Sequence, residues 1–288
     1  MAHHSRGKTH MTESTPCGIT ANSLTVGYGH RPVIDQLDVH IPPATFTAII
    51  GPNACGKSTL LRALARLLPA RSGQVLLDGA DIRDLSGMQL ARRLALLPQS
   101  PVTPDGITVV DLVSRGRYAH QSVLSQWSRN DARAVQAALS AAGVAELAHR
   151  HVDELSGGQR QRAWIALALA QETDVLLLDE PTTFLDIAHQ VEVLELAVRL
   201  CDEGRTVVAV LHELAMAARY ATHVIAMRDG RIVAEGPPQD VVTAEVIREV
   251  FDLDAQVIED PETGAPVVLP RGVHRDLASP SRRRRAVH

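Results

Sequence analysis

The most constraining feature of this chain is a short glycine-rich stretch that ends in a lysine and two hydroxyl residues. Its members are Gly51, Pro52, Asn53, Ala54, Cys55, Gly56, Lys57, Ser58 and Thr59. The apolar, β-branched run Thr45–Ile50 comes before it, and leucines recur after it at helical spacing, from Leu60 to Leu68, until Pro69. A strand, a glycine loop and a helix in this order are the setting of a phosphate-binding loop.

The residue types in this loop suit a triphosphate. Glycines let the backbone turn tightly, so that successive N–H groups can point inward at phosphate oxygens. The start of the helix adds a partial positive charge, and Lys57 adds a full one. The hydroxyl of Ser58 can ligate a Mg²⁺ ion that bridges two phosphates. A glycine turn with no binding function would need neither Lys57 nor Ser58. The sequence therefore predicts that this loop binds a nucleoside triphosphate.

Composition narrows the remaining classes of protein. The chain has 288 residues, 3% aromatic residues and a net charge of -4, so aliphatic side chains must fill the core and a general affinity for nucleic acid is not expected. The 3 cysteines lie far apart, which argues against a disulfide framework or a zinc site. No apolar stretch approaches the roughly 20 residues of a membrane span, and the first residues lack the apolar centre of a signal peptide. We expect a soluble protein in a reducing compartment that reaches a membrane only through a partner.

Two acidic residues follow a second apolar run. Val175–Leu178 is typical of a parallel strand buried on both faces, and Asp179 and Glu180 come directly after it. Because adjacent residues of a strand point in opposite directions, the two carboxylates cannot do the same work. We expect Asp179 to hold Mg²⁺ and Glu180 to orient or deprotonate the water that attacks the γ-phosphate.

Single polar residues follow other predicted strands. His212 follows Thr206–Leu211, at the sheet edge where open α/β folds bind ligands, and it can donate a hydrogen bond to a γ-phosphate. Gln99 follows another apolar run. Tyr28, between two glycines, could stack on a nucleotide base or pack on the sheet. Each of these residues also has an ordinary structural explanation when it is considered alone.

A second glycine-containing motif precedes a long helical pattern. Leu155, Ser156, Gly157, Gly158 and Gln159 come before the alanine- and leucine-rich run Arg160–Ala170. Free N–H groups, a hydroxyl and the helix dipole favour an anion at such a helix start. In isolation the motif is equally typical of a helix capped by serine.

Taken in order, these motifs resemble the nucleotide-binding subunit of an ATP-binding cassette (ABC) transporter. The resemblance covers about residues 18–270 and is specific, because the phosphate loop and the Leu-Ser-Gly-Gly-Gln signature occur together. It implies an α/β fold, with a P-loop NTPase RecA-like core, an antiparallel β-subdomain and an inserted helical subdomain at about 100–170. It also implies the cofactors ATP and Mg²⁺. We expect an ATPase domain over 17–270, a disordered N-terminus over 1–16 and a basic tail over 271–288.

The resemblance also implies a role for each motif. The residues matching those that act on ATP within one subunit are Gly51 to Thr59, Gln99, Asp179, Glu180 and His212, with Tyr28 stacked on adenine. Glu180, His212 and Gln99 form the catalytic set, and Ser58, Gln99 and Asp179 form the metal set. The residues implied to serve the ATP of the opposite subunit in a head-to-tail homodimer are Ser156, Gly157, Gly158 and Gln159. Asp186 would lie in the loop that crosses this interface.

Two finer stretches are similar to ferric-siderophore importer ATPases. One comprises Arg115–Tyr118 and His120–Gln121, followed by Gln126, Trp127 and Asp131, and the other is Thr182–Gln190. Haem and cobalamin importers share much of this pattern and remain alternatives; a non-transport cassette ATPase is a more distant one. The resemblance implies a polytopic permease as partner, a substrate-binding protein as indirect partner, and a peripheral position at the cytoplasmic face of the membrane. Ala54, Thr183 and Glu213 depart from the wider pattern but remove no phosphate- or metal-facing group, so we expect activity.

Two further points stay open in the sequence. The thiol of Cys55 lies beside Lys57 and a helix start, so it could be a reactive thiolate that faces the phosphates. It could equally be a small, inert side chain turned into the core. The run Arg282–Arg285 could contact an anionic membrane surface or be part of a solvated tail.

Overall fold

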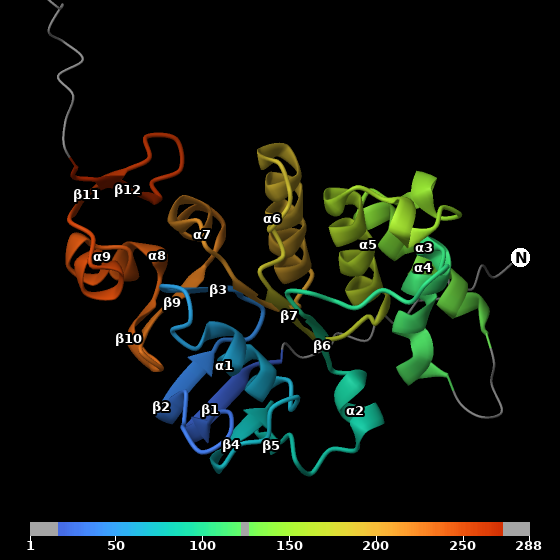
Figure 1. The fold of residues 1–288 in the computed structure, drawn as a ribbon, viewed down its shortest axis with the longest axis horizontal. Coiled ribbons are helices and arrows are strands. Elements are labelled where there is room, and N and C mark those ends of the chain that lie inside the picture. The colour runs from blue at the N-terminus through green and yellow to red at the C-terminus, as the bar shows by residue number, and fades with distance from the viewer. Residues whose placement is uncertain (1–16, 122–126, 273–288) are drawn as a thin grey trace, which may run out of the picture.

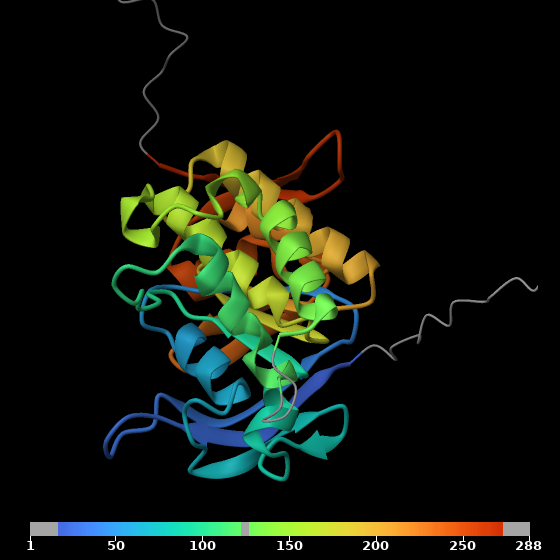
Figure 2. The same ribbon diagram turned by 90° about the vertical axis from the view of Figure 1, so that its right-hand side faces the viewer.

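The computed structural model describes residues 17–121 and 127–272 (Figure 1). The expectations for the N-terminal segment 1–16 and for Arg282–Arg285 lie outside these residues. Within them, two sheets lie one above the other with a helix between them, and further helices cover the far face of the central sheet (Figures 1 and 2). Among the described residues, no helix combines the length and apolar composition that a membrane span requires.

The central sheet has six strands in the order β10-β9-β3-β8-β7-β6. They are β3 (Phe46–Ile50), β6 (Leu94–Leu97), β7 (Val175–Asp179), β8 (Thr206–Val210), β9 (His223–Arg228) and β10 (Arg231–Gly236). β10 pairs antiparallel with β9, and the other pairs are parallel. Every residue of β3, β7 and β8 is buried, because the sheet is covered on both faces. Leu177 packs toward one core and its neighbour Leu178 toward the other.

An antiparallel sheet packs under the central one, in the order β2-β1-β4-β5. Its strands are β1 (Ile19–Val26), β2 (Ile34–Ile41), β4 (Ser72–Leu77) and β5 (Ala80–Asp81). The helix α1 (Lys57–Leu64) lies between the two sheets (Figure 1). Its Leu60 and Leu64 share one apolar core with Ile19 of β1 and Ile49 of β3. Burial of α1 on both sides therefore holds the loop before it against the central sheet.

The helix after the glycine loop is shorter than its leucine pattern predicts. α1 ends at Leu64, and Leu67 is 67% exposed, so the prediction of a helix to Leu68 is wrong. Arg66 takes the left-handed conformation (φ 58°), and the N–H of Leu67 turns back to the carbonyl of Arg62 at 2.8 Å. The guanidinium of Arg66 also donates to the carbonyl of Leu85 at 2.6 Å. Local backbone bonds of Arg66 and Leu67 thus end the helix before Pro69, and the side chain of Arg66 joins this end to Leu85.

Between β6 and β7 the described chain contains helices and turns. These elements are α3 (Val109–Ser114), η1 (Arg115–His120), α4 (Arg129–Ala141), η2 (Ala145–Leu147), η3 (Val152–Glu154) and α5 (Gly157–Ala170). The remaining elements are α2 (Gly87–Ala91), α6 (Ile187–Asp202), α7 (Leu214–Tyr220), α8 (Pro238–Val241), α9 (Ala244–Phe251), β11 (Ala255–Glu259) and β12 (Pro266–Pro270). The α/β fold class predicted above is confirmed.

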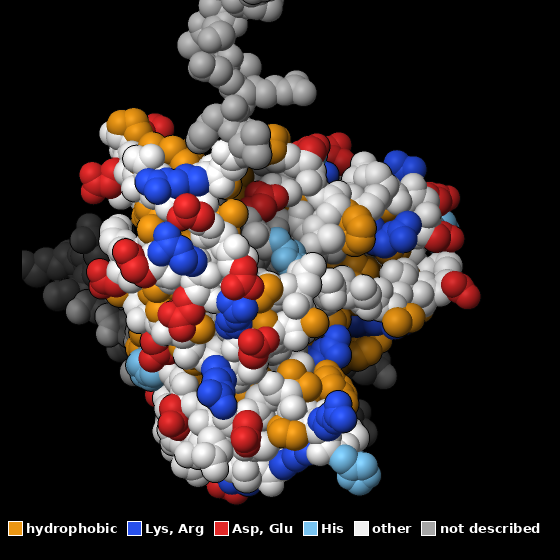
Figure 3. Space-filling view, turned by 60° about the vertical axis from the view of Figure 1, so that its left-hand side comes forward, with side chains coloured by type: hydrophobic (Ala, Val, Ile, Leu, Met, Phe, Trp, Pro, Cys, Tyr) orange, Lys and Arg blue, Asp and Glu red, His pale blue; other side chains and the backbone are white. Residues whose placement is uncertain are grey.

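The surface carries charges of both signs. On the face that Figure 3 shows, lysine and arginine side chains alternate with aspartate and glutamate side chains, and no large area of one sign is visible. Ion pairs such as Arg228–Asp252 and Arg248–Asp254, both 2.8 Å long, join opposite charges near α9. This face therefore lacks the positive stripe that a nucleic-acid interface would present.

Candidate nucleotide-binding site

Five parallel strands of the central sheet end at one edge, and a cleft of about 720 Å³ lies there. Parallel strands bring their carboxyl ends together, so residues far apart in the sequence meet at this edge. The cleft is lined by Val33, Asn53, Ala54, Gly56, Lys57, Ser58, Thr59, Gln99, Glu180, Thr183 and His212. The glycine loop, the glutamine, the glutamate and the histidine singled out in the sequence thus line one cleft.

The glycine loop takes backbone conformations that suit glycine. Gly51 and Gly56 have φ values of 153° and 112°, and a Cβ on Gly51 would lie 2.2 Å from the carbonyl oxygen of Met227. Gly51 is therefore required by the close approach of β9. Ala54 also has a positive φ, 62°, which costs a non-glycine residue about 1–2 kcal/mol. Its methyl group faces the cleft rather than the core, so the departure noted in the sequence is tolerated sterically.

Lys57 is folded back into the loop. Its Nζ donates to the carbonyl oxygens of Gly51 and Pro52, each at 2.9 Å, and the side chain is buried. Two neutral carbonyls are weaker partners than phosphate oxygens. The ammonium group is consequently positioned at the floor of the cleft, where it can exchange these bonds for bonds to a triphosphate.

Ser58 and Asp179 form a pair of oxygen donors beside the loop. The Oγ of Ser58 donates to Oδ1 of Asp179 at 2.8 Å, and Asp179 is only 1% exposed. Burial raises the pKa of the Asp179 carboxyl, while the Ser58 hydroxyl acts against this rise. A hydroxyl and a buried carboxylate are hard oxygen ligands that fit Mg²⁺, and a divalent cation would favour the charged form of Asp179.

Glu180 is held from both sides of the cleft. Its Oε1 lies 2.6 Å from Nε2 of His212, and its Oε2 accepts a hydrogen bond from Nε2 of Gln99 at 2.7 Å. Thr183 donates a third, longer bond to Oε2 at 3.3 Å. These contacts come from the ends of β6 and β8 and from the loop after β7. A carboxylate fixed in this way can orient a water molecule and accept its proton.

Two cleft residues were not proposed from the sequence. Thr183 reaches Glu180 because the loop turns back on itself, with the N–H of Thr183 donating to the Glu180 carbonyl at 3.3 Å. Thr183 follows the predicted catalytic Glu180 by only three residues in the sequence, and this spacing could have singled out its hydroxyl. Val33 precedes β2 and lines the cleft from the antiparallel sheet. No local pattern singles out this valine.

Several predicted site residues lie outside the cleft lining. Tyr28 is 51% exposed, and its hydroxyl accepts a bond from Arg62 at 3.2 Å. Ser156 caps α5, and its Oγ accepts from the N–H of Gln159 at 3.3 Å, so Gly157 and Gly158 form the start of that helix. The residues of the signature motif are therefore not among those that line the cleft.

Asp186 caps α6 in the loop that follows Thr183. Its Oδ1 accepts from the N–H of His189 at 3.0 Å and lies 2.7 Å from the His189 Nδ1. These bonds, the backbone one first, lower the pKa of the Asp186 carboxyl. Asp186 is exposed, as is the neighbouring Phe184. Like the signature motif, this residue is not among those that line the cleft.

The orientation of Cys55 decides between the two alternatives for its thiol. The side chain is 4% exposed and packs in the core that α1 shares with the antiparallel sheet. Burial raises the pKa of the thiol, against the lowering effect of Lys57. The hypothesis that Cys55 is a reactive thiolate is therefore wrong. The alternative, an inert side chain packed in the core, agrees with the structure.

The order of the strand ends defines a class of protein. The phosphate loop follows β3, and the acidic pair lies at the end of β7, with β8 between the two strands. A carboxylate on the strand next but one to the loop, across from a buried lysine and a serine hydroxyl, belongs to the P-loop nucleoside triphosphatases.

Comparison with known proteins narrows this class. The profile of the family described as ABC transporter matches residues 34–183. The ferric enterobactin transport ATP-binding protein of Escherichia coli is 52% identical over 91% of this chain and 97% of its own. A siderophore transport system ATP-binding protein of Bacillus subtilis is 51% identical over 88% and 93%. A hemin import ATP-binding protein of Rhodococcus jostii is 39% identical over 88% and 86%.

Solved structures agree with this result. A metal-chelate type ABC transporter in an inward-facing conformation has a TM-score of 0.76 at 27% identity, covering 89% of this chain and 98% of that one. A dimeric bacterial ABC transporter cassette has a TM-score of 0.69 at 26% identity, covering 76% and 98%. The chain belongs to the ABC transporter family, and it is an ATP-binding, ATP-hydrolysing subunit.

Proposed function

We propose that this chain hydrolyses ATP to power the import of ferric siderophores through a membrane permease. The observation that carries the hydrolytic part is the fixed position of Glu180 between Gln99 and His212 at the mouth of the phosphate loop. The substrate class is supported by the relatives named for ferric enterobactin and siderophore transport, which cover nearly the whole chain.

The loop residues bind the triphosphate. Lys57 leaves the carbonyls of Gly51 and Pro52 and contacts the β- and γ-phosphate oxygens, and the first N–H groups of α1 donate to the same phosphates. Ser58, Asp179 and Gln99 are the residues that would hold Mg²⁺. Bound there, the ion neutralises charge on the phosphates. The Ser58–Asp179 contact already brings two of these donors together.

Glu180 acts on the attacking water. One of its oxygens accepts a hydrogen bond from the water and takes its proton, while Gln99 and Thr183 keep the carboxylate in place. With ATP bound, the Nε2 of His212 exchanges its contact with the other oxygen of Glu180 for the γ-phosphate, to which it donates, and stabilises the charge that develops there. The exposed ring of Tyr28 stacks on the adenine.

Two subunits act together. The start of α5 lies outside the cleft lining of its own subunit and is formed by Ser156, Gly157, Gly158 and Gln159. A helix start of this kind binds anions, so it needs a phosphate from another subunit. A head-to-tail homodimer supplies it, with the motif of one subunit on the ATP of the other and Asp186 at the interface. The dimer sits on the permease at the cytoplasmic face of the membrane. A substrate-binding protein delivers the chelate to the permease, and nucleic acid has no part in the cycle.

Uptake of labelled chelates tests this function directly. The chromosomal copy is replaced by Lys57→Ala, and uptake of ⁵⁵Fe-siderophores, haem and cobalamin is measured in the same strain. We expect loss of ferric-siderophore uptake alone, because without Lys57 the phosphate loop lacks its full charge. A matched control is Arg83→Ala, an exposed arginine that pairs with Asp81 away from the cleft. Loss of haem or cobalamin uptake with siderophore uptake intact would contradict the proposed substrate class.

A further inference from the structure

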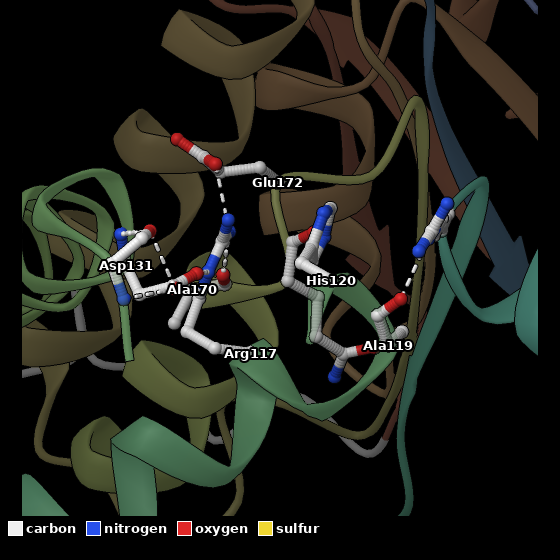
Figure 4. Close-up of polar contacts among 9 residues, drawn as sticks. Arg117, Ala119, His120, Asp131, Ala170 and Glu172 are labelled. Atoms are coloured by element: carbon white, nitrogen blue, oxygen red, sulfur yellow. Dashed lines mark hydrogen bonds and ion pairs between the residues drawn. The ribbon is translucent and has the colours of Figure 1, made fainter. Parts of the chain in front are cut away.

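A buried arginine lies in the short helix η1, outside the cleft. Arg117 is 4% exposed. Its Nε donates to Oδ1 of Asp131 at 2.9 Å, and its Nη1 donates to Oε2 of Glu172 and to the carbonyl of Ala170, each at 2.7 Å (Figure 4). The guanidinium thus joins η1, the first turn of α4 and the end of α5. Its planar fork satisfies these acceptors in one fixed geometry.

Two other residues of η1 also contact the C-terminal end of α5. His120 lies 2.7 Å from the carbonyl oxygen of Gln171 through its Nε2 (Figure 4). Gly116 lies so close to the helix that an added Cβ would be 2.5 Å from the carbonyl oxygen of Leu167. A guanidinium on the terminal carbonyl of a helix also complements its dipole. η1 therefore holds the last turn of α5.

A further contact ties η1 to the core. The Nε of Arg92 donates to the carbonyl oxygen of Ala119 at 2.6 Å (Figure 4). Arg92 is the C-cap residue of α2, and β6 begins two residues after it. β6 leads to Gln99, which contacts Glu180. The position of α5 is thus set relative to the strand that carries a cleft residue.

The other end of α5 begins at the signature motif. α5 runs from Gly157 to Ala170, with Ser156 as its cap, so Arg117 and the motif lie at opposite ends of one rigid rod about 20 Å long. A tilt at one end of such a rod displaces the other end. We infer that Arg117 is a positioning residue, which acts through α5 to place Ser156–Gly158 against the ATP bound by the opposite subunit. This inference rests on the homodimer proposed above.

Stability alone does not explain this arginine. A buried ion pair adds little net stability compared with well-packed apolar side chains, because both charges must be desolvated. What it does provide is a single orientation of the elements that it joins. The test must therefore separate positioning from stability.

Heterodimers of differently tagged subunits make this separation. Lys57→Ala inactivates the cleft of the subunit that carries it, so the remaining active site uses the other subunit's loop and the signature motif of the Lys57→Ala subunit. Arg117→Met is placed either on the same chain as Lys57→Ala or on the opposite chain. Both heterodimers contain the same two substitutions. ATP turnover at saturating MgATP is measured after purification on both tags.

We expect turnover to fall about tenfold or more when both substitutions share a chain, because a displacement of about 1 Å can have effects of that size. In the opposite-chain arrangement turnover should match that of Lys57→Ala paired with wild type. Equal losses in the two arrangements would overturn the inference and make Arg117 a structural residue. Arg117→Lys keeps the charge without the fork and should give a smaller same-chain loss. It also replaces Arg117→Met in the test if that variant does not fold.

Two controls complete the design. Ser156→Arg, placed in the same two ways, reports on the dimer arrangement itself. If it also shows no dependence on the chain, the head-to-tail dimer is wrong and the failure belongs to the proposed function. If it depends on the chain while Arg117→Met does not, only the positioning role is overturned. Arg83→Met, on an exposed pair with Asp81, should change neither arrangement.

Discussion

At the scale of single residues, Glu180 is the most constrained position. It adopts the left-handed backbone conformation (φ 55°), which a non-glycine residue takes only at a cost of about 1–3 kcal/mol. Contacts from Gln99, His212 and Thr183 fix its carboxylate from three directions. Strain that persists because the surroundings over-determine it is typical of functional sites. The backbone and the side-chain contacts thus both single out this glutamate.

Replacing Glu180 tests its proposed role. Glu180→Gln keeps the size and the contacts to Gln99 but cannot accept the proton of the attacking water. We expect ATP affinity to be retained and hydrolysis in a single-turnover assay to fall about 10²- to 10⁴-fold. Glu195→Gln, on the exposed face of α6, is the control. Turnover within a factor of two of wild type would remove Glu180 from the catalytic role.

At the scale of elements, α4 depends on a buried carboxylate at its first turn. Ser128 and Asp131 form a capping box, in which the Ser128 hydroxyl donates to Oδ2 of Asp131 at 2.7 Å. This bond lowers the pKa of Asp131 to about 2, and bonds from the Ser128 backbone and from Arg117 act in the same direction. One residue therefore caps α4 and neutralises the arginine that holds α5.

The stability of this part of the fold should depend on pH. Because the pKa of Asp131 is lower in the folded state, its contribution is present above the ordinary pKa of an aspartate and is lost as pH falls from about 4 to about 2. At pH 7, Asp131→Asn removes one of the two carboxylates that pair with the buried Arg117, leaving Glu172, and should lower the free energy of unfolding by about 2 kcal/mol. Urea unfolding at pH 7, 4, 3 and 2.5 measures the difference from wild type.

The difference should shrink toward the lowest pH. Asp111→Asn provides a matched control, because Asp111 lies three residues after the capping residue Thr108 at the start of α3 and contacts its hydroxyl, but is exposed. We expect the control to change stability by no more than about 0.5 kcal/mol. A difference for Asp131→Asn that stays constant down to pH 2.5 would contradict the ionic contribution.

At the scale of the whole molecule, the proposed homodimer implies that the cleft of one subunit is incomplete. Its lining includes Lys57 and the proposed catalytic Glu180, with Asp179 bonded to Ser58 beside it, but the start of α5 lies outside this lining. Two defective subunits should therefore complement each other. Mixing Lys57→Ala with Ser156→Arg should restore one intact composite site per heterodimer, so the mixture should hydrolyse ATP when neither variant does alone. A mixture no more active than its components would contradict the head-to-tail arrangement.

The local motifs could be recognised without any structure, because strand, loop and helix follow one another directly in the chain. The phosphate loop after β3, the pair Asp179–Glu180 after β7 and His212 after β8 each follow a run of apolar residues. A parallel sheet buried on both faces requires such runs, and it brings their ends to one edge whatever lies between them. The sequence thus determined the class of fold and most of the residues that line the cleft.

Contacts between distant segments decided the rest. Whether the Cys55 thiol faces phosphate or core depends on how α1 packs between two sheets. Just after α1, the side chain of Arg66 bonds to Leu85, which lies 19 residues further along the chain. The contact of Gln99 with Glu180 and the burial of Arg117 against α5 join residues that no local pattern relates. These features follow from packing and desolvation in the assembled fold, and therefore only the tertiary structure could decide them.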